Sequence, residues 1–567
     1  MPIRITIANN AKQSQKSATI LPISTYDPAT PNSYRVQVLK AAQNKLRLKN
    51  GSRIFVGGTS QELLSEDDWK SALKDDVVLL VSKGEDYVGL KREVAQINSN
   101  TSDGAPKPNR TVNILAHSAS VDALSITQLE TTARTLPGLL HAVGQPDLHP
   151  GTKFPIGAVF VSRGWIHPPL IGGDIGCGMA WYRPRLSRGQ VEGDKARKVA
   201  ERLRGLEGAW RGVREREKWL RDEQAGKSWA AGEEWDKAVG TIGAGNHFAE
   251  IQVVEESAAE EAGVRQDEVV LLVHSGSRGY GGDVLKSHAS DADPSFREDD
   301  PKAKAYLEEH ERACNWAKAN RDLIALRFLS CLEPGEEAWE LGRNIHEESS
   351  ASIDEAIALA KAKLRERKVV DIWHNNVERI RWPPLSPPST SPPAELADHT
   401  SSLSIVDSDS SCYAYVHRKG AAPTYDPQTH KLLHVLPLPG SRGTPTLLLR
   451  PTFSASTDWG AKNALSLAHG AGRAMSRTRA LTSINQKYAG DATVLLQPNA
   501  ASQAYVKSGR DVKGGTWVVC DEKDLVWEEA PEAYKDVWDV AGDLVGAGIA
   551  ECVGWCRPRV SYKVRVE

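Results

Sequence analysis

The chain has 567 residues, of which 40% are hydrophobic and 25% are charged, a composition typical of globular proteins and unlike that of disordered chains. Its 71 basic and 73 acidic residues give a formal net charge of −2. No overall positive field therefore attracts nucleic acid, and a phosphate-bearing partner needs a local basic site. The length predicts about three or four domain-sized units, or one large domain with an extra module.

The cysteines and the N-terminal segment bear on the cellular location. The seven cysteines are scattered, without the spacing of a disulfide framework or a zinc ribbon, which favours a reducing compartment. The first residues, MPIRITIANN, lack the basic and apolar regions of a secretory signal, and no run of about 18 apolar residues follows. We therefore expect a cytoplasmic protein, or one that is also nuclear, without membrane association.

The first 89 residues form a pattern of their own. IRITIA alternates like a strand, RIFVGG and VVLLVSKG are typical of further short strands, and SYRVQVLKAAQNKLRL has apolar residues at helical spacing. This order resembles that of ubiquitin-like or doublecortin-like modules and predicts a β-grasp domain at 1–89. Because it carries no catalytic motif, we expect it to dock a protein partner or only to add solubility. Residues 90–110 have the composition of a linker.

From Thr111 to the C-terminus, short apolar runs alternate with charged helical stretches, which predicts a mixed α/β (α+β) catalytic domain at 111–567. One stretch at about 382–411 is dominated by proline and serine and is expected to be a disordered insertion. Surface loops tolerate insertions well, so an insertion without consequence is favoured over a regulatory phosphorylation loop.

Candidate metal ligands lie in glycine-rich stretches. In IGGDIGCGM, Asp174 and Cys177 are surrounded by glycines, which permit close approach of a ligand. GTIGAGNHFAEI, LLVHSGSRGYGG and DIWHNNVE place His247, His274 and His374 beside small or amide residues near the ends of apolar runs. A thiolate and imidazoles suit a transition metal and a carboxylate suits a harder ion such as Mn²⁺, so the set fits two metals bridged by sulfur. In the alternative, Asp174 caps a helix and the cysteine and histidines are ordinary core residues.

Two later stretches suit a phosphate ligand. PGSRGTPTLLL is a small-residue loop that can offer backbone N–H groups, and SLAHGAGRAMSRTRA places His469 before two glycines and a set of arginines. Arg473, Arg477 and Arg479 carry forked donors for phosphate oxygens. Each loop alone could also be a tight turn.

Together these stretches resemble the RtcB-type RNA ligase family over most of 111–567. The matching stretches, in the order of the family, are QPDLHPGTKFPIG, GGDIGCGM, GAGNHFAE, HSGSRGYG, NWAKANR, HNN, HRKGA, PGSRGT, HGAGRAMSR and EAPEAYKDV. The sequence GGDIGCGM is more similar to a divergent branch of the family than to its main tRNA-ligase branch. The resemblance implies an RtcB-like catalytic domain behind the small β-grasp domain.

The resemblance also implies site roles. Cys177 would bridge two Mn²⁺ ions, with Asp174 and His374 completing one site and His247 and His274 the other. His469 would attack the α-phosphate of GTP to give a guanylylated histidine, since a neutral imidazole is a competent nucleophile near neutral pH. Glycines after His469 would give room to the pyrophosphate and the metals. Residues expected to contact the nucleotide are Asn246, Glu250, Ser441, Thr446, Gly470, Gly472, Arg473, Tyr534 and Lys563.

The chain departs from the family pattern in places. After HRKGA the family commonly continues with Thr, Arg and Ala, whereas this chain has Ala422, Pro423 and Thr424, so an expected phosphate-binding arginine is missing. Arg442 stands where the family often has methionine and could replace part of the lost charge.

The resulting prediction is a GTP- and Mn²⁺-dependent RNA ligase, acting in RNA repair or tRNA splicing, that joins 3′-phosphate or 2′,3′-cyclic phosphate ends to 5′-hydroxyl ends. Because of the missing arginine, a metal-dependent RNA end-processing phosphodiesterase is an alternative. A ligase-like interaction protein that senses a nucleotide is another.

Overall fold

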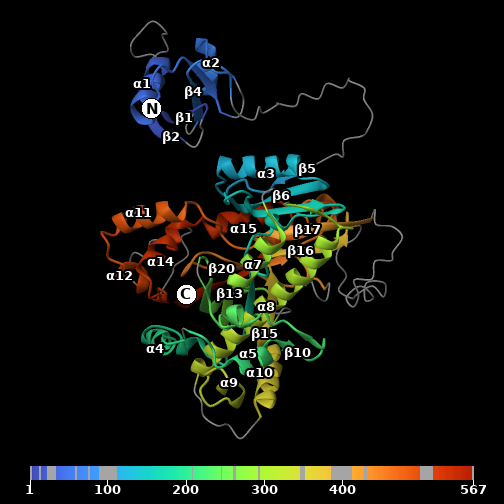
Figure 1. Cartoon of the computed structure of the whole chain (residues 1–567). Helices are drawn as coiled ribbons and strands as arrows, with labels where there is room; N and C mark the ends of the chain where they lie inside the picture. The colour runs from blue at the N-terminus through green and yellow to red at the C-terminus, as the bar shows by residue number, and fades with distance from the viewer. Residues whose placement is uncertain are drawn as a thin grey trace. The chain divides into compact units, whose positions relative to one another are not determined.

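The structure is a computed structural model of the whole chain (Figure 1). It divides into two compact units, Met1–Pro106 and Lys107–Glu567. The predicted linker at 90–110 and most of the predicted insertion at 382–411 lie outside the described residues. The described residues are 3–11, 15–21, 34–57, 61–73, 77–87, 111–206, 208–243, 245–259, 263–290, 294–344, 352–384, 412–426, 431–498 and 515–564.

The first unit is a mixed sheet that shares one core with residues of two helices. The sheet has the strand order β2-β1-β4-β3, in which β1 pairs in parallel with β4 and antiparallel with β2. Alternate residues of β1, Ile5 and Ile7, are buried with Val38 and Ala42 of α1. This arrangement is compatible with the predicted β-grasp module, which stays a prediction. The elements are β1 (Ile3–Asn9), β2 (Lys16–Leu21), α1 (Tyr34–Leu46), β3 (Arg53–Val56), α2 (Glu66–Ala72) and β4 (Val77–Ser82).

The second unit contains two larger sheets and some short strand pairs. The larger sheet runs in the order β15 (Lys368–Trp373), β9 (Gly178–Tyr182), β13 (Val269–Ser275), β12 (Phe248–Ser257), β23 (Ala550–Tyr562), β20 (Thr446–Pro451), β19 (Leu436–Pro439), and β22 (Trp517–Val519) also pairs with β23. The other sheet is β16 (Asn375–Arg381), β17 (Tyr413–Lys419), β7 (Ile156–Ser162), β6 (Leu139–His149), β5 (Thr111–Ile114). The short pairs are β18 (Ala421–Pro423) with β21 (Ser466–Ala468), β10 (Arg221–Asp222) with β11 (Lys227–Ser228), and β8 (Trp165–Ile166) with β14 (Phe296–Arg297).

The two larger sheets share a hydrophobic core. Successive residues of a strand point to opposite faces, so Trp181 of β9 and Leu272 of β13 lie in one core cluster while Tyr182 and Val273 lie in another. The cluster of Trp181 and Leu272 also contains residues of β6, β7 and β17, such as Val159, from the other sheet. The opposite face of the larger sheet is covered by a long helix, α8 (Figure 1).

Helices flank these sheets. Helix α8 begins after Asp300, whose side chain accepts a hydrogen bond from the Lys302 N–H, with a proline in its first turn. No helix within the described ranges is long and apolar enough to cross a membrane. The predicted mixed α/β class is confirmed. The helices are α3 (Ala123–Thr135), α4 (Asp194–Arg202), α5 (Val213–Trp219), α6 (Glu233–Asp236), α7 (Gly279–His288), α8 (Pro301–Leu332), α9 (Glu337–Glu340), α10 (Ile353–Arg367), α11 (Arg477–Lys487), α12 (Thr493–Leu496), α14 (Lys523–Glu528) and α15 (Val537–Gly546), with short 3₁₀ turns η1 (Pro168–Leu170), η2 (Arg188–Gln190), η6 (Ala455–Gly460) and η7 (Pro531–Ala533).

Candidate metal centre and nucleotide site

Neighbouring strands of the larger sheet bring the predicted metal ligands together. Cys177 directly precedes β9, whose two partners in the sheet are β13, with His274 near its end, and β15, which is followed at once by His374. His247 directly precedes β12, and the first pair between β12 and β13 is Phe248 with His274. Adjacent strand ends meet at one edge of the sheet, so ligands far apart in the sequence become neighbours.

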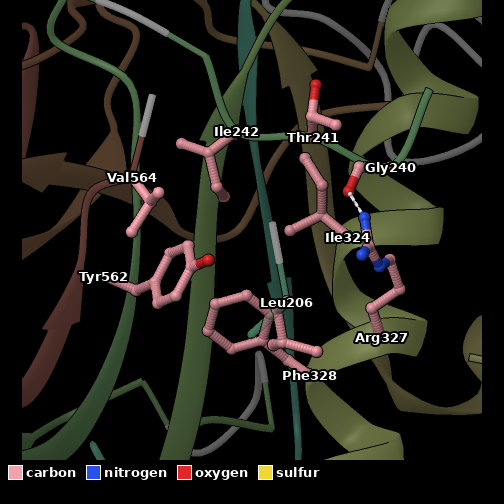
Figure 2. A pocket seen from close by; sticks show the side chains of 9 residues that line it. All are labelled: Leu206, Gly240, Thr241, Ile242, Ile324, Arg327, Phe328, Tyr562 and Val564. Atoms are coloured by element: carbon pink, nitrogen blue, oxygen red, sulfur yellow. Dashed lines mark hydrogen bonds between the residues drawn. The ribbon is translucent and has the colours of Figure 1, made fainter. Parts of the chain in front are cut away.

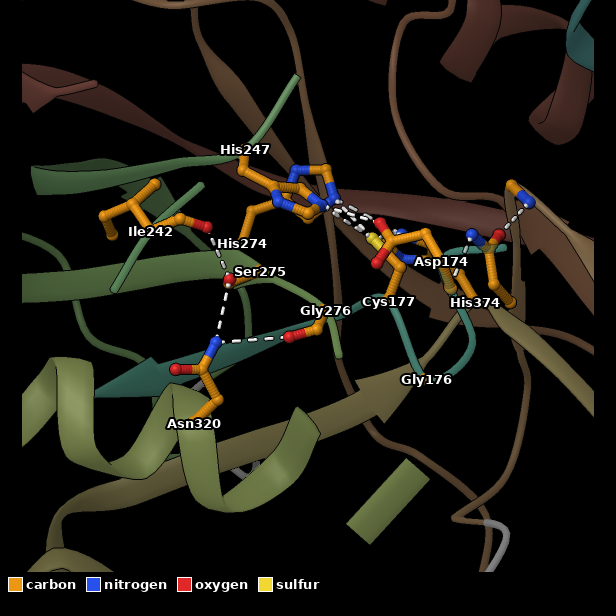
Figure 3. A network of polar contacts seen from close by, with 12 residues as sticks. Asp174, Gly176, Cys177, Ile242, His247, His274, Ser275, Gly276, Asn320 and His374 are labelled. Carbon is orange, nitrogen blue, oxygen red and sulfur yellow. Dashed lines mark hydrogen bonds and ion pairs between the residues drawn. The ribbon is translucent and has the colours of Figure 1, made fainter. Parts of the chain in front are cut away.

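The ligand atoms converge on the sulfur of Cys177 (Figure 3). The Nε2 atoms of His247, His274 and His374 lie 3.2, 3.4 and 3.2 Å from Cys177 Sγ. Asp174 Oδ2 lies 2.8 Å from His247 Nε2. Cys177 and the three histidines are at most 4% exposed, whereas the Asp174 side chain is 35% exposed. The cluster is therefore buried on the side of the sheet and open beside Asp174.

The ligand atoms form two groups that share Cys177. One group is Cys177, His274 and His374, and the other is Asp174, Cys177 and His247. This grouping differs from the expected one, in which Asp174 was grouped with His374, and the assignment of ligands to ions stays a prediction. The strand order explains the difference, because β13 and β15 flank β9 and so place His274 and His374 together, while the loop before β9 places Asp174 beside His247.

The chemistry of this donor set fits divalent transition metals. Burial, reinforced by the neighbouring histidines, lowers the pKa of His274 and His374 well below its usual range, so both rings are in the neutral form that binds metals. Burial and the Asp174 carboxylate raise the pKa of Cys177, so the thiolate needs a cation beside it. Burial opposes ionisation of Asp174, but His247 outweighs it and the pKa of Asp174 is lowered.

Helix α8 holds two of the ligand-bearing segments, which explains the NWAKANR stretch. Arg321, fully buried, donates from Nη1 to the carbonyls of Gly176 and Ser275 at 2.9 and 3.0 Å. Asn320 donates to Ser275 Oγ and to the Gly276 carbonyl, both at 3.1 Å (Figure 3). These bonds fix the residues next to Cys177 and His274 and so position the two ligands.

The glycines around Cys177 have a different role from the expected one. A Cβ on Gly176, where φ is +72°, would lie 2.7 Å from the Cα of Cys314 in α8, and one on Gly178 would lie 2.0 Å from the Ile372 carbonyl oxygen. Such distances are too short for any side chain. These glycines therefore allow close packing of the ligand loop on protein backbone, rather than clearing space for ions.

His469 lies beside the metal ligands and is hydrogen-bonded to an aspartate. It follows β21, and its ring centroid is 4.6 Å from that of His374. Its Nδ1 lies 2.7 Å from Oδ2 of Asp147, a fully buried residue of β6. The carboxylate accepts a hydrogen bond from Nδ1–H, which leaves the Nε2 lone pair for another partner. A Cβ on Gly472 would lie 2.3 Å from the Asp147 carbonyl oxygen, so this glycine packs on Asp147 rather than making room for pyrophosphate.

Lys535 fixes the backbone on both sides of Asp147. Its Nζ donates to the carbonyls of Pro146 and Leu148 at 2.9 and 2.7 Å. Burial lowers the pKa of Lys535 to about 8, while the charge of Asp147 opposes that shift. The segment before α15 therefore supports the partner of His469.

Several residues predicted to contact the nucleotide form a connected polar group. Gln252 donates to Glu250 Oε2 and to Thr446 Oγ1 at 2.8 and 2.9 Å. The Gly443 N–H donates to Glu250 Oε1 at 3.0 Å. Burial raises the pKa of Glu250 to about 7. The carboxyl group therefore keeps its proton to a higher pH than an exposed glutamate does.

Other predicted nucleotide residues meet around Glu529. Ser441 Oγ donates to the Glu529 carbonyl at 3.1 Å, and the Tyr534 hydroxyl is hydrogen-bonded to the Glu529 carboxylate. Arg473 donates to the Tyr534 hydroxyl at 3.2 Å and lies over its ring. Arg473 covers one face of the Tyr534 ring, so a nucleotide base could stack only on the opposite face.

The remaining predicted residues link this region to the metal ligands. Lys563, 1% exposed, donates from Nζ to the His247 carbonyl at 2.7 Å, and burial lowers its pKa to about 8. Asn246 is half-buried and directly precedes His247. Gly470 lies beside Pro439, at the start of the loop that carries Ser441. The predicted nucleotide and metal residues therefore lie in one continuous region.

Comparisons with known proteins show to which family the chain belongs. The sequence model of the family described as "tRNA-splicing ligase RtcB" matches residues 128–235, 207–379 and 403–564. The chain is 33% identical over 448 residues to RNA-splicing ligase RtcB2 of Escherichia coli, covering 78% of this chain and 93% of that protein. The chain belongs to the RtcB family. The predicted resemblance is thereby confirmed.

More distant RtcB proteins are similar over the same part of the chain. The tRNA-splicing ligase RtcB of Methanococcus maripaludis is 26% identical over 75% of this chain and 88% of its own length. RNA-splicing ligase RtcB homolog 1 of Entamoeba dispar is 26% identical over 77% of this chain and 82% of its own length. The RtcB match begins at residue 128, so the unit Met1–Pro106 lies outside it.

A small pocket elsewhere in the RtcB domain does not coincide with the predicted site. It lies between α8, the end of β23 and the segment 240–242 (Figure 2). Its lining is mostly apolar, with Arg327 donating to the Gly240 carbonyl at 2.7 Å. Among the described residues that line it, none is a predicted metal, nucleotide or catalytic residue.

Sequence reasoning missed several residues of this region. Asp147 was visible only as the carboxylate of the matching stretch QPDLHPG, and its distance of 322 positions from His469 hid their contact. Gln252 and Glu529 lie within two and five residues of the predicted Glu250 and Tyr534. Proximity to predicted residues was therefore the available signal for both.

Proposed function

We propose that this protein is an RNA ligase that uses GTP and two Mn²⁺ ions to join RNA 3′-phosphate or 2′,3′-cyclic phosphate ends to 5′-hydroxyl ends through a guanylylated His469. The observation that carries the proposal is the position of His469, with Nδ1 2.7 Å from the buried Asp147 and its ring beside His374. This arrangement supports a role for His469 as an oriented nucleophile next to the proposed metal centre. Membership of the RtcB family supports the same conclusion.

The two groups of ligands would hold the two metal ions. Asp174, Cys177 and His247 would hold one, and Cys177, His274 and His374 the other. Paired cations, when bound, neutralise phosphate oxygens and orient the attacking and leaving groups. The protein supplies their position, through the strand ends and through Arg321 and its bonds to the Gly176 and Ser275 carbonyls.

His469 would act first. Asp147 accepts a hydrogen bond from Nδ1–H, which holds the proton on Nδ1 and leaves the Nε2 lone pair free to attack the α-phosphorus of GTP. A P–N bond forms, the bond from phosphorus to the bridging oxygen breaks, and pyrophosphate leaves with the electron pair. A 2′,3′-cyclic phosphate end would first be hydrolysed to a 3′-phosphate. An oxygen of the RNA 3′-phosphate would then attack the phosphorus on His469, and the P–N bond would break with its electron pair returning to Nε2. The 5′-hydroxyl oxygen would attack the RNA 3′-phosphorus, lose its proton to solvent and release GMP, which joins the strands.

The polar group around Glu250 and Glu529 would bind the nucleotide. Glu250, Ser441, Thr446 and Lys563 are buried there, and each can exchange an internal hydrogen bond for one to a base or ribose. Arg473, with Tyr534, is placed to contact the phosphates or the base. Asn246, Gly470 and Gly472 are proposed to complete the contact with the nucleotide.

Joining of RNA with defined ends tests the proposal. A 3′-phosphate strand and a 5′-hydroxyl strand, incubated with GTP and Mn²⁺, should give a joined product that depends on both cofactors. A cyclic phosphate that is opened without joining would instead show the alternative end-processing activity. Ala422, Pro423 and Thr424, which replace the expected arginine, motivate that comparison. His469→Ala should give no joined product. His434→Ala replaces an exposed histidine and is the matched control, which should join the strands as the wild type does.

A further inference from the structure

Arg442 is a buried arginine with an unused donor. It lies between β19 and β20 and is 4% exposed. Its Nη2 donates to the Val526 carbonyl at 2.8 Å. Its Nη1 is buried and has no hydrogen-bond partner among the described residues. Burying an unpaired polar group is unfavourable, and for a guanidinium nitrogen the cost is larger than for a neutral group. A ligand that accepts from Nη1 would remove that cost.

The surroundings of Arg442 are those of the proposed nucleotide site. Its neighbours in the chain, Ser441 and Gly443, contact the Glu529 carbonyl and the Glu250 carboxylate. Burial lowers the pKa of Arg442, while the acidic groups around it, Glu250 and Glu529 among them, oppose that shift. The free donor therefore lies within electrostatic reach of the carboxylates that we assign to the nucleotide.

We infer that Arg442 selects guanine over adenine by donating from Nη1 to the O6 atom of the base. The inference rests on the proposed function, because it concerns the same nucleotide site. Guanine presents the acceptors O6 and N7 along one edge, whereas adenine carries a donor amino group in place of O6. A guanidinium is the side chain that most often contacts this edge of guanine.

The other groups of the site suit the same base. Glu250 is an acceptor and matches the donor groups at N1 and N2 of guanine, which adenine lacks. A base with acceptors on one edge and donors on the other would therefore satisfy both Arg442 and Glu250. Adenine would leave Nη1 facing an amino donor, and sites of this kind discriminate strongly because a buried group stays unpaired.

Nucleotide binding to the full-length protein tests the inference. The probes are the α,β-methylene analogues of GTP and ATP, which cannot transfer their nucleotidyl group, with Mn²⁺ present. In Arg442→Met, the guanine analogue should bind about 10- to 100-fold more weakly, as expected for loss of a charged hydrogen bond. Binding of the adenine analogue should change less than about twofold, so the preference for guanine shrinks.

Arg450→Met is the matched control, because Arg450 lies on neighbouring β20 with a 42% exposed side chain paired with Glu551, and it should leave both affinities unchanged. Arg442→Gln should reproduce the selective loss, and it decides the outcome if thermal melting shows that Arg442→Met does not fold. Equal weakening of both analogues, or no change in either, would overturn the inference. A wild-type protein that binds neither analogue would contradict the proposed function as well.

Discussion

Replacing Asp147 by asparagine removes the charge that orients His469 and leaves the volume of the side chain unchanged. The Asp147 Oδ2 and His469 Nδ1 atoms are 2.7 Å apart, and Asp147 is fully buried, so this hydrogen bond is charge-assisted and shielded from water. Such bonds contribute about 1.5–3 kcal/mol. As positive charge develops on the ring during attack, the loss falls on the transition state. We therefore expect guanylylation to slow about 10- to 150-fold.

The assay is the single-turnover rate of label transfer from α-labelled GTP to the protein, with bound metal measured in the same sample. Asp122→Asn is the matched control, since Asp122 caps α3 at the surface and asparagine is an equally good cap. Bound metal and melting temperature should stay near the wild-type values in Asp147→Asn. An unchanged rate of transfer would refute the role of Asp147.

Three further predictions concern the metal centre and its supports. Cys177→Ala should lose both metal ions and all ligation, measured by elemental analysis and RNA joining, and Cys177→Ser should recover little because a serine hydroxyl is far harder to deprotonate; full metal occupancy in Cys177→Ala would contradict the bridging role. Lys535→Met should slow guanylylation while keeping the metal, because the Pro146 and Leu148 carbonyls lose their donor; an unchanged rate would show that Asp147 is positioned without it. Burial raises the pKa of Glu250 from 4.5 to about 7, so the folded state keeps a proton that the unfolded state loses, and stability falls as pH rises across that window. Glu250→Gln should reduce this fall by about 1–3 kcal/mol in denaturant melts at pH 5 and pH 8, and identical pH dependence in both proteins would contradict the shift.

The local sequence predicted several elements and also indicated the candidate metal ligands, which stay a prediction. The strand-like runs IRITIA, RIFVGG and VVLLVSKG correspond to β1, β3 and β4. The predicted helical stretch SYRVQVLKAAQNKLRL contains α1. Periodicity carried the prediction of α1, which buries helically spaced residues, whereas β4 was indicated by a short apolar run and buries all its residues but one. The strand β2 and the helix α2 were not predicted, since neither has a strong apolar period.

The geometry of the site could not be predicted from one sequence. Whether His274 groups with His374 or with His247 depends on the order of β15, β9 and β13 in the sheet, which is a property of tertiary pairing. The role of Gly176 and Gly178 likewise depends on α8 and β15, which pack against them. The residue types indicated which side chains could bind a metal, and the strand order determines which of these side chains lie next to one another.

Contact between Asp147 and His469 shows the same limit. Asp147 lies on β6 and His469 directly follows β21, and these strands belong to different sheets. The two residues meet only because β6 and β21 pack together. No pattern near either residue indicates the other.

The most direct test of the central claim is the site of covalent labelling. After incubation with α-labelled GTP and Mn²⁺, the protein should carry an acid-labile guanylyl group, and peptide mass spectrometry should locate it on His469. His469→Ala should form no adduct and retain its metal ions, because the other five residues hold them. A label on another residue, an adduct in His469→Ala, or no adduct in metal-loaded wild-type protein would contradict the account.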